Sequence, residues 1–285
     1  FSIIALCDPG DEVIYPNPGF PIYESVANFV GAKPVPIPLR EENQFRLDVD
    51  ELKSLITPKT KMLIINSPQN PTGGYLKRED VEAIADAVRG KGIVVLSDEI
   101  YDRLVYTDEK PLSIASLPGM KDWTIILDGF SKTYAMTGWR LGFGVMHKAI
   151  AEKVAKLMTN SNSCTASFTQ MAGIEALTGP QDAVEAMKAE FKKRRDIIVD
   201  GLNDIPGVSC LRPEGAFYVF PNVKSFGKSS QEIADYLLYE AGVACLPGTS
   251  FGSYGEGYLR FSYANSVENI EKALARVKEA LARLK

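Results

Sequence analysis

The segment KMLIINSPQNPTG, residues 61–73, carries the clearest signal for the fold, because an apolar run passes directly into a polar turn. Residues 61–66 form a short stretch rich in Ile, Leu and Met, which is typical of a strand buried on both faces. The Pro and Gly residues that follow predict a turn. Since the same succession recurs along the first half of the chain, we predict an α/β fold with a mostly parallel sheet.

On both sides of this segment, short β-branched runs alternate with amphipathic stretches. The expected strands are Glu12–Tyr15, Lys33–Ile37, Lys61–Asn66, Ile93–Ser97, Thr124–Asp128 and Leu141–Met146. The expected helices between them are Ile22–Phe29, Val49–Leu55 and Arg78–Arg89. This alternation is the pattern of a parallel sheet flanked by helices on both faces.

The second half of the chain has a different pattern. A long helix is expected over Gln181–Leu202, followed by strands at Val208–Leu211, Phe217–Phe220, Val243–Leu246 and Tyr258–Tyr263 and by helices at Ser230–Ala241 and Val267–Leu284. We therefore expect a large α/β domain over residues 1–190 and a smaller C-terminal α+β domain over residues 191–285.

Composition excludes several classes of function. The 285 residues contain 32 Lys and Arg against 36 Asp and Glu, a net charge of −4, so neither nucleic acid nor an anionic membrane is an expected partner. His147 is the only histidine and the four cysteines are widely spaced, which argues against a metal site and against a histidine triad. No apolar run reaches the length of a membrane span, and a reducing cytoplasm fits this cysteine usage.

Polar side chains follow three successive predicted strands. Asn70 lies in the turn after the first, Asp98 and Tyr101 follow the second, and Ser131 and Lys132 follow the third. In a parallel sheet these carboxyl ends meet at one edge, where ligands bind. Each residue alone also has a plain structural interpretation, as a helix cap, a turn former or a solvated lysine. Their convergence favours a functional site.

A site with Lys, Asp, Asn and Tyr but no histidine or metal suits a cofactor that forms a Schiff base with lysine. The lysine amine attacks an aldehyde, a carboxylate pairs with a pyridine nitrogen, and amide or hydroxyl groups bind a phenolic oxygen. Pyridoxal 5′-phosphate (PLP) needs this set of partners. We therefore predict PLP as the cofactor.

Several motifs together carry a family resemblance. They are NPTG at 70–73, DEIY at 98–101, SK at 131–132, GWRLG at 138–142 and YLRFSYA at 258–264. In this order the chain resembles a class I/II aminotransferase of fold type I, similar to the aspartate aminotransferases, along essentially its whole length. The resemblance implies transfer of an amino group from an amino acid to a 2-oxo acid in two half-reactions, and it implies a homodimer.

The resemblance also implies a role for each residue that matches the family motifs. It implies that Lys132 forms the Schiff base and moves the α-proton, that Asp98 pairs with the pyridine nitrogen, and that Asn70 and Tyr101 bind the phenolic oxygen. It implies further that Ser131 and Arg140 hold the phosphate, that Phe20 stacks on the ring, that Arg260 binds the substrate carboxylate, and that Asn70 also contacts the substrate. For Phe20, an ordinary core position is the competing interpretation. Arg260 also has a local argument, since strand alternation separates it from Leu259 and Phe261.

Two departures from the family pattern bear on cofactor binding. A glycine-rich phosphate-binding turn and a tyrosine lent by the neighbouring subunit come, in the family, before the position of Phe1, and Gly129 stands where many relatives have a further serine. We therefore expect the chain to be a portion of a longer polypeptide that alone binds PLP weakly or fails to fold.

Two alternative functions remain open. The lysine, aspartate and aromatic set controls formation of a carbanion and not its fate, so a β-lyase or decarboxylase of the same fold is the first alternative. The second is a non-enzymatic sensing domain that resembles an aminotransferase. The side-chain specificity for the amino donor does not follow from spacing.

Overall fold

The six strands expected in the first half form one sheet in the computed structural model, which describes residues 1–284. They are β1 (Glu12–Asn17), β2 (Lys33–Pro38), β3 (Thr60–Asn66), β4 (Val94–Asp98), β5 (Thr124–Gly129) and β6 (Gly142–Val145). The order across the sheet is β2-β1-β3-β4-β5-β6. The first five strands are parallel and β6 is antiparallel to β5. The prediction of a mostly parallel sheet is confirmed.

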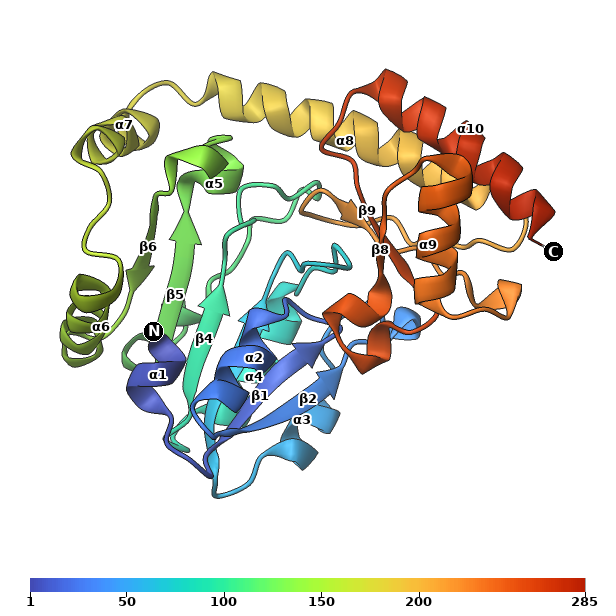
Figure 1. Ribbon diagram of the computed structural model, residues 1–285. Helices are drawn as coiled ribbons and strands as arrows, with labels where there is room; N and C mark the ends of the chain where they lie inside the picture. Colours follow the sequence, from blue (N-terminus) through green and yellow to red (C-terminus); the bar gives the residue numbers. More distant parts are fainter. Residues whose placement is uncertain (285) are drawn as a thin grey trace.

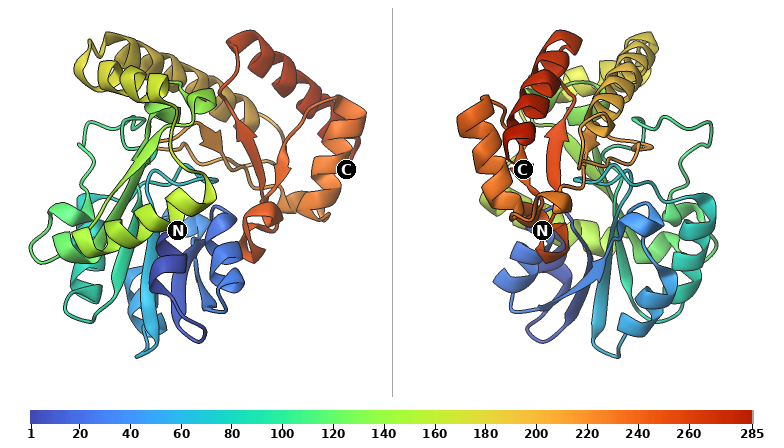
Figure 2. Two further views of the ribbon diagram at one scale, coloured as in Figure 1. Left: turned by 60° about the vertical axis from the view of Figure 1, so that its left-hand side comes forward. Right: turned by 90° about the vertical axis from the view of Figure 1, so that its right-hand side faces the viewer.

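Helices cover both faces of this sheet, as the right-hand view of Figure 2 shows. They are α1 (Ser2–Leu6), α2 (Ile22–Phe29), α3 (Val49–Leu55) and α4 (Arg78–Val88), with the short α5 (Phe130–Thr133) after β5. Successive residues of β3 point to opposite faces of the sheet. Met62 belongs to the buried cluster that includes Ala27 of α2, whereas Leu63 belongs to the cluster that includes Ile84 of α4. Each fully buried side chain of this kind contributes roughly 1.5–3 kcal/mol to folding.

A C-terminal lobe, consisting of α8 to α10 and β7 to β9, lies beside the sheet (Figure 1). Its elements are α8 (Asp182–Asn203), β7 (Tyr218–Val219), α9 (Ser230–Ala241), β8 (Leu246–Pro247), β9 (Leu259–Ser262) and α10 (Val267–Arg283). The strands form an antiparallel sheet in the order β7-β9-β8. Figure 1 shows α10 lying along the later part of α8. Leu202 of α8, Leu237 of α9 and Leu281 of α10 belong to one buried cluster.

The structure corrects two of the strands expected in this lobe. Val208–Leu211 forms no strand, because only Ser209 makes a single bridge, to Asn222. The strand expected at Val243–Leu246 begins only at Leu246. The first residues of the expected strand instead complete the end of α9. There Gly242 adopts a left-handed conformation, and the Val243 amide donates to the Leu237 carbonyl at 3.0 Å. A helix cap has therefore replaced the start of the strand.

Two further helices, α6 (Lys148–Ser161) and α7 (Ser167–Thr178), connect β6 to α8 and were not among the expected elements. Phe168, Met171, Ile174 and Leu177 of α7 are all more than half exposed. Among residues 1–284, no helix combines the length and the apolar composition that crossing a membrane requires.

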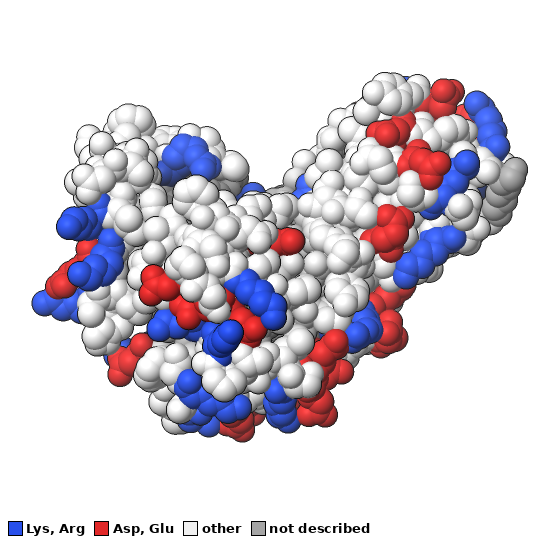
Figure 3. Space-filling view, turned by 60° about the horizontal axis from the view of Figure 1, so that its bottom comes forward, with Lys and Arg blue, Asp and Glu red and all other residues white. Residues whose placement is uncertain are grey.

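Charged side chains of both signs are intermixed over the face shown in Figure 3. On this face, acidic groups interrupt the basic ones, so it offers no broad basic surface of the kind that binds phosphate backbones.

Candidate active site

The strand ends meet as expected at the carboxyl edge of the sheet. Asn66, the last residue of β3, pairs with Asp98, the last residue of β4, and Asp98 pairs with Leu127 of β5. A cavity of about 460 Å³ opens at this edge, within the size range of small-molecule sites. Six of the eight predicted site residues line it, namely Phe20, Asn70, Asp98, Tyr101, Lys132 and Arg260.

Asp98 is held from two sides at the end of β4. One carboxylate oxygen accepts a hydrogen bond from the Tyr23 hydroxyl at 2.6 Å, and the other accepts one from the Ile100 amide at 3.3 Å. Burial raises the pKa of the Asp98 carboxyl, and the two hydrogen bonds oppose that rise because they stabilise the charged form. The result is an oriented carboxylate that faces the cavity and lacks a cationic partner among the described residues.

Lys132 reaches the same cavity from α5, one turn beyond β5. Its amine lies 5.3 Å from the centre of the Phe217 ring and 5.7 Å from that of Tyr101. Burial lowers the pKa of the Lys132 ammonium, and the positive charges of Arg260 and Arg140 lower it further. This environment favours the neutral amine, which is the nucleophilic form.

Arg260 joins the C-terminal lobe to the sheet. Its guanidinium donates a hydrogen bond to the Asn70 side-chain oxygen at 2.9 Å, across 190 residues of sequence. The group lies over two aromatic rings, 4.4 Å from the centre of Tyr218 and 4.6 Å from that of Phe251. Its Nε is buried without a hydrogen-bond partner among the described residues. A buried donor of this kind is costly unless a ligand satisfies it.

Tyr101 borders the cavity beside a second tyrosine. Its hydroxyl lies 3.0 Å from the hydroxyl of Tyr218, and its side chain is otherwise buried. Burial and the nearby Tyr218 and Asp98 oxygens raise the pKa of the Tyr101 phenol. Tyr101 therefore stays protonated near neutral pH and is available as a donor.

Phe20 is not a core residue, because its side chain is 43% exposed and borders the cavity. Its ring meets that of Tyr23 edge-on at 6.0 Å between centres. The alternative interpretation of Phe20 as ordinary core packing is therefore wrong.

Ser131 and Arg140 do not line this cavity. Ser131 precedes Lys132 on α5, and Arg140 follows the short helix Thr137–Trp139 with a left-handed backbone. The Arg140 guanidinium donates to the Thr137 carbonyl at 2.8 Å and borders a separate hollow beside Phe168. Arg140 is still near enough to Lys132 for its charge to act on the amine.

Four further polar residues line the cavity that were not among the predicted site residues. They are Tyr23, Asn66, Asp128 and Tyr218. Asn66 is the last residue of β3 and Asp128 the last but one of β5, so the same strand-end reasoning would have found both. Tyr23 and Tyr218 reach the site only through tertiary packing. In the described part of the chain, no three His, Cys, Asp or Glu side chains are grouped in a way that could hold a metal ion.

Asp128 makes protein stability depend on pH. Burial and the negative charge of Asp102 raise the pKa of its carboxyl to about 7. Because the folded protein then binds this proton more tightly than the unfolded chain does, the stabilisation is complete below about pH 4 and is lost as pH rises through about 7. Asp128→Asn is expected to raise the Tm of the cofactor-free protein by about 2–4 °C at pH 8, which corresponds to roughly 1 kcal/mol after allowance for partial exposure.

Thermal unfolding followed by circular dichroism at pH 5 and pH 8 checks this prediction. Asp122→Asn, at an exposed position before β5, serves as the matched control and should leave the profile unchanged. If the Asp128→Asn and Asp122→Asn proteins gain or lose stability equally at both pH values, the stated effect of Asp128 is wrong.

Comparison with known proteins agrees with this geometry. Residues 1–277 match the model of the family "Aminotransferase class I and II". The chain is 46% identical over 282 residues to an aspartate aminotransferase of Pyrococcus abyssi, covering 98% of this chain and 72% of that protein. It is 44% identical over 273 residues to aromatic-amino-acid aminotransferase 2 of Thermococcus litoralis, covering 95% of this chain and 70% of that protein.

Solved structures give the same result. The aromatic aminotransferase of Pyrococcus horikoshii superposes with a TM-score of 0.96 at 43% identity, covering 99% of this chain and 76% of that one. The aspartate aminotransferase of Thermus thermophilus, solved with maleate, superposes with a TM-score of 0.91 at 35% identity, covering 98% of this chain and 72% of that one. The fold is therefore that of the aspartate aminotransferases. The chain belongs to the aminotransferase class I and II family, whose members typically use PLP.

Proposed function

We propose that this chain binds PLP in the cavity at the ends of β3, β4 and β5 and transfers an amino group from an amino acid to a 2-oxo acid in two half-reactions. The observation that carries the proposal is that Lys132 and Asp98 border one cavity, one supplying an amine and the other a carboxylate. When bound, PLP supplies an aldehyde that reacts with an amine and a ring that accepts electrons released at the α-carbon.

The residues of the cavity fit this cofactor. Its lining combines an amine, a carboxylate, an amide and a phenol, and Phe20 offers a half-exposed aromatic ring at the border. Among residues 1–284 the carboxylate of Asp98 has no cationic partner, which suits a protonated pyridine nitrogen. We propose that Asn70 and Tyr101 donate to the phenolic oxygen of the ring and that Phe20 stacks on it. The high pKa of Tyr101 supports its role as a donor.

Lys132 is proposed to carry the proton that leaves and returns during the reaction. An amine can accept a proton only in its neutral form, and the lowered pKa of Lys132 increases the share of that form near neutral pH. Tyr23 is proposed to orient Asp98 through its 2.6 Å hydrogen bond, so that one carboxylate oxygen stays directed to the cofactor nitrogen.

We propose that Ser131 and Arg140 hold the phosphate group. Ser131 directly precedes Lys132 in the chain, and Arg140, eight residues further on, is near enough for its charge to act on the Lys132 amine. Arg140 donates to the Thr137 carbonyl with Nη1, so its other donors remain for an anion.

Arg260 is proposed to bind the α-carboxylate of the substrate. Its Nε is buried without a partner in the described part of the chain, and its guanidinium lies over two rings and bonds to Asn70. These features suit a planar two-oxygen anion. Arg260→Lys is expected to raise KM for the amino donor about 10- to 100-fold with a smaller change in kcat, because lysine cannot form the two parallel hydrogen bonds.

Steady-state kinetics with the amino donor varied checks this expectation. Arg40→Lys, at an exposed arginine that pairs with Glu51, is the matched control and should leave KM within about twofold of the parent. An unchanged KM in the Arg260→Lys protein would remove Arg260 from the substrate site.

The substrates and the assembly are also part of the proposal. The names of the relatives indicate aspartate or an aromatic amino acid as the donor, and we propose donors of these two classes.

We propose a homodimer, which the exposed apolar side chains of α7 support, because apolar surface of this kind is usually covered. We also propose a large domain over residues 1–190 and a small one over residues 191–285, joined through the continuous helix α8.

Isotope transfer tests the proposed reaction. The purified protein is mixed with PLP, ¹⁵N-labelled aspartate and 2-oxoglutarate, and the products are followed by mass spectrometry, with ¹⁵N-labelled phenylalanine as a second donor. We expect ¹⁵N-glutamate to form from at least one donor. Release of ammonia or carbon dioxide without labelled glutamate would contradict the proposal in favour of a β-lyase or decarboxylase. Binding of PLP without any turnover would contradict it in favour of a sensing domain.

A further inference from the structure

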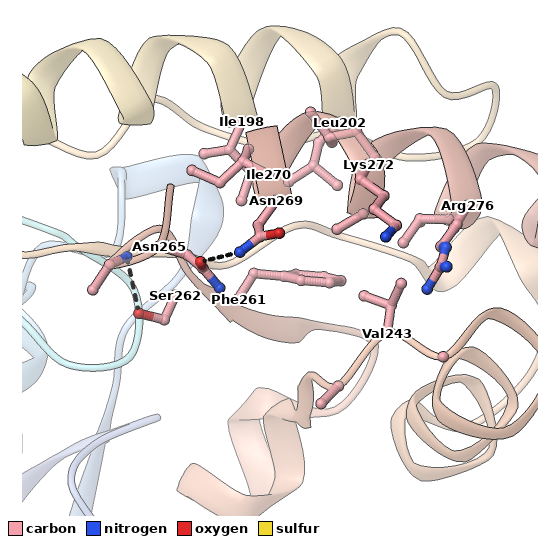
Figure 4. A pocket seen from close by; sticks show the side chains of 16 residues that line it. Ile198, Leu202, Val243, Phe261, Ser262, Asn265, Asn269, Ile270, Lys272 and Arg276 are labelled. Carbon is pink, nitrogen blue, oxygen red and sulfur yellow. Dashed lines mark hydrogen bonds between the residues drawn. The ribbon is translucent and has the colours of Figure 1, made fainter. Parts of the chain in front are cut away.

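A second cavity lies in the C-terminal lobe, between α8, α10 and β9 (Figure 4). Its volume is about 460 Å³, similar to that of the cavity at Lys132. The two cavities share no lining residue. On β9, Phe261 borders this second cavity, whereas its neighbour Arg260 borders the first, because successive side chains of a strand point to opposite faces. The second cavity is therefore a separate space that the proposed reaction does not use.

The floor of the second cavity is apolar. It is formed by six side chains of the lobe's core, each less than a tenth exposed: Ile198, Leu202, Val243, Phe261, Ile270 and Val277. Figure 4 shows Ile198, Leu202 and Ile270 gathered between the two helices, with Phe261 on the strand below them. A ligand that enters the cavity therefore meets hydrocarbon, which favours an apolar body over a fully hydrated ion.

Two positive charges border this floor. Lys272 and Arg276 lie one turn apart on α10, and Figure 4 shows both side chains directed toward the loop that carries Val243. Within residues 1–284, neither forms an ion pair or a side-chain hydrogen bond, and no Asp or Glu lines the cavity. Like charges at this spacing repel each other and weaken a helix slightly. An anion placed between them would relieve that repulsion.

The other basic residues of α10 behave differently. Lys278 pairs with Asp204 at 2.6 Å, and Arg283 pairs with Glu279. The protein as a whole carries more acidic than basic groups, so carboxylates are not scarce. Within residues 1–284, the two basic side chains of α10 that lack an ion pair thus both border the apolar cavity, where charge and hydrocarbon can act on one ligand together.

We propose that this second cavity binds a monocarboxylate with an apolar body, with the carboxylate between Lys272 and Arg276 and the body against the apolar floor. The side-chain amides of Asn265 and Asn269, joined by a 2.9 Å hydrogen bond, border the same space and add polar contacts at its entrance. The proposal goes beyond the amino-transfer function and does not depend on it, since it involves no residue of the first cavity.

Titration with 3-phenylpropionate, followed by methyl NMR on protein labelled at Ile, Leu and Val, tests the proposal and separates the two cavities. We expect saturable shifts at Val243, Ile270 and Val277. Shifts confined to Ile100 and Leu127, which border the first cavity, would overturn the proposal, as would the absence of any saturable shift. Three further probes each carry only one part of this ligand. Acetate and inorganic phosphate carry a negative charge without an apolar body, and 3-phenylpropan-1-ol carries the apolar body without a charge.

Each partial probe is expected to bind at least about tenfold more weakly than 3-phenylpropionate, because each loses either the charge contacts or the apolar contacts. The double variant Lys272→Gln and Arg276→Gln should weaken binding of 3-phenylpropionate about tenfold. The double variant Lys278→Gln and Arg283→Gln removes two paired charges from the same helix and should change it less than about twofold. Equal affinity in both double variants, or equal affinity for the alcohol, would overturn the proposal. All four positions are exposed, so these variants should fold.

Discussion

Replacing Lys132 with alanine is expected to lower kcat/KM for amino transfer at least about 10³-fold, because we propose that this one amine both attaches the cofactor and moves the proton. The side chain projects into the cavity and its charge has no salt-bridge partner among the described residues, so its loss should disturb the fold little. The rate of ¹⁵N transfer from aspartate to 2-oxoglutarate, measured for parent and variant, gives the effect directly.

Two controls separate a chemical role of Lys132 from a structural one. Lys121→Ala, at an exposed lysine before β5, should leave the rate unchanged. A small primary amine such as ethylamine, added to the Lys132→Ala protein, should restore part of the rate, because it can enter the vacated space and take the proton. A Lys132→Ala protein that retains more than about a tenth of the parent rate would show that another group performs the chemistry.

Replacing Asp98 with asparagine is expected to lower kcat/KM about 10²- to 10³-fold, which is the usual effect of removing one oriented electrostatic partner from a buried site. Asparagine keeps the shape of the side chain and can still accept the Tyr23 hydrogen bond, but its amide nitrogen cannot accept the longer one from Ile100, so the change removes the negative charge together with that 3.3 Å contact. Without that charge, a pyridine nitrogen bound at this position would hold its proton less firmly. The same isotope-transfer assay measures the loss.

Glu99→Gln is the matched control for Asp98→Asn. Glu99 is the neighbouring acid, it is engaged by Ser97 and Ser113, and it does not border the cavity. We expect it to change the rate less than about threefold. Equal losses in the Asp98→Asn and Glu99→Gln proteins would indicate a general effect of the local negative charge, and the specific role of Asp98 would then be rejected.

The main sheet and most of the first cavity could be predicted because their signals are local. The apolar run of β3 and the Pro-rich turn after it identify a buried strand and its end, and the parallel arrangement then brings Asn70, Asp98 and Lys132 to one edge. The position of Arg260 follows from strand alternation, since Leu259 and Phe261 are buried in the core while Arg260 faces the first cavity. These inferences need only strand periodicity and the rule for parallel sheets.

The remaining parts depend on contacts that sequence spacing does not encode. The Tyr23 hydroxyl meets Asp98 across 75 residues, and the Tyr218 hydroxyl meets that of Tyr101 across 117. Helix α7 has apolar residues on several sides, so it shows no single apolar face of the kind that marks an amphipathic helix. The strand predicted at Val243–Leu246 begins only at Leu246, because Val243 takes part in the cap of α9.

The central claim is that the amine of Lys132 holds PLP opposite the carboxylate of Asp98. Reduction of the PLP-treated protein with borohydride, followed by digestion and peptide mass spectrometry, tests it most directly, because reduction fixes the cofactor on the lysine to which it is bound. We predict a single phosphopyridoxyl group on the peptide that contains Lys132, and none in the Lys132→Ala protein. A label on another lysine, or amino transfer without any label at Lys132, would contradict the claim.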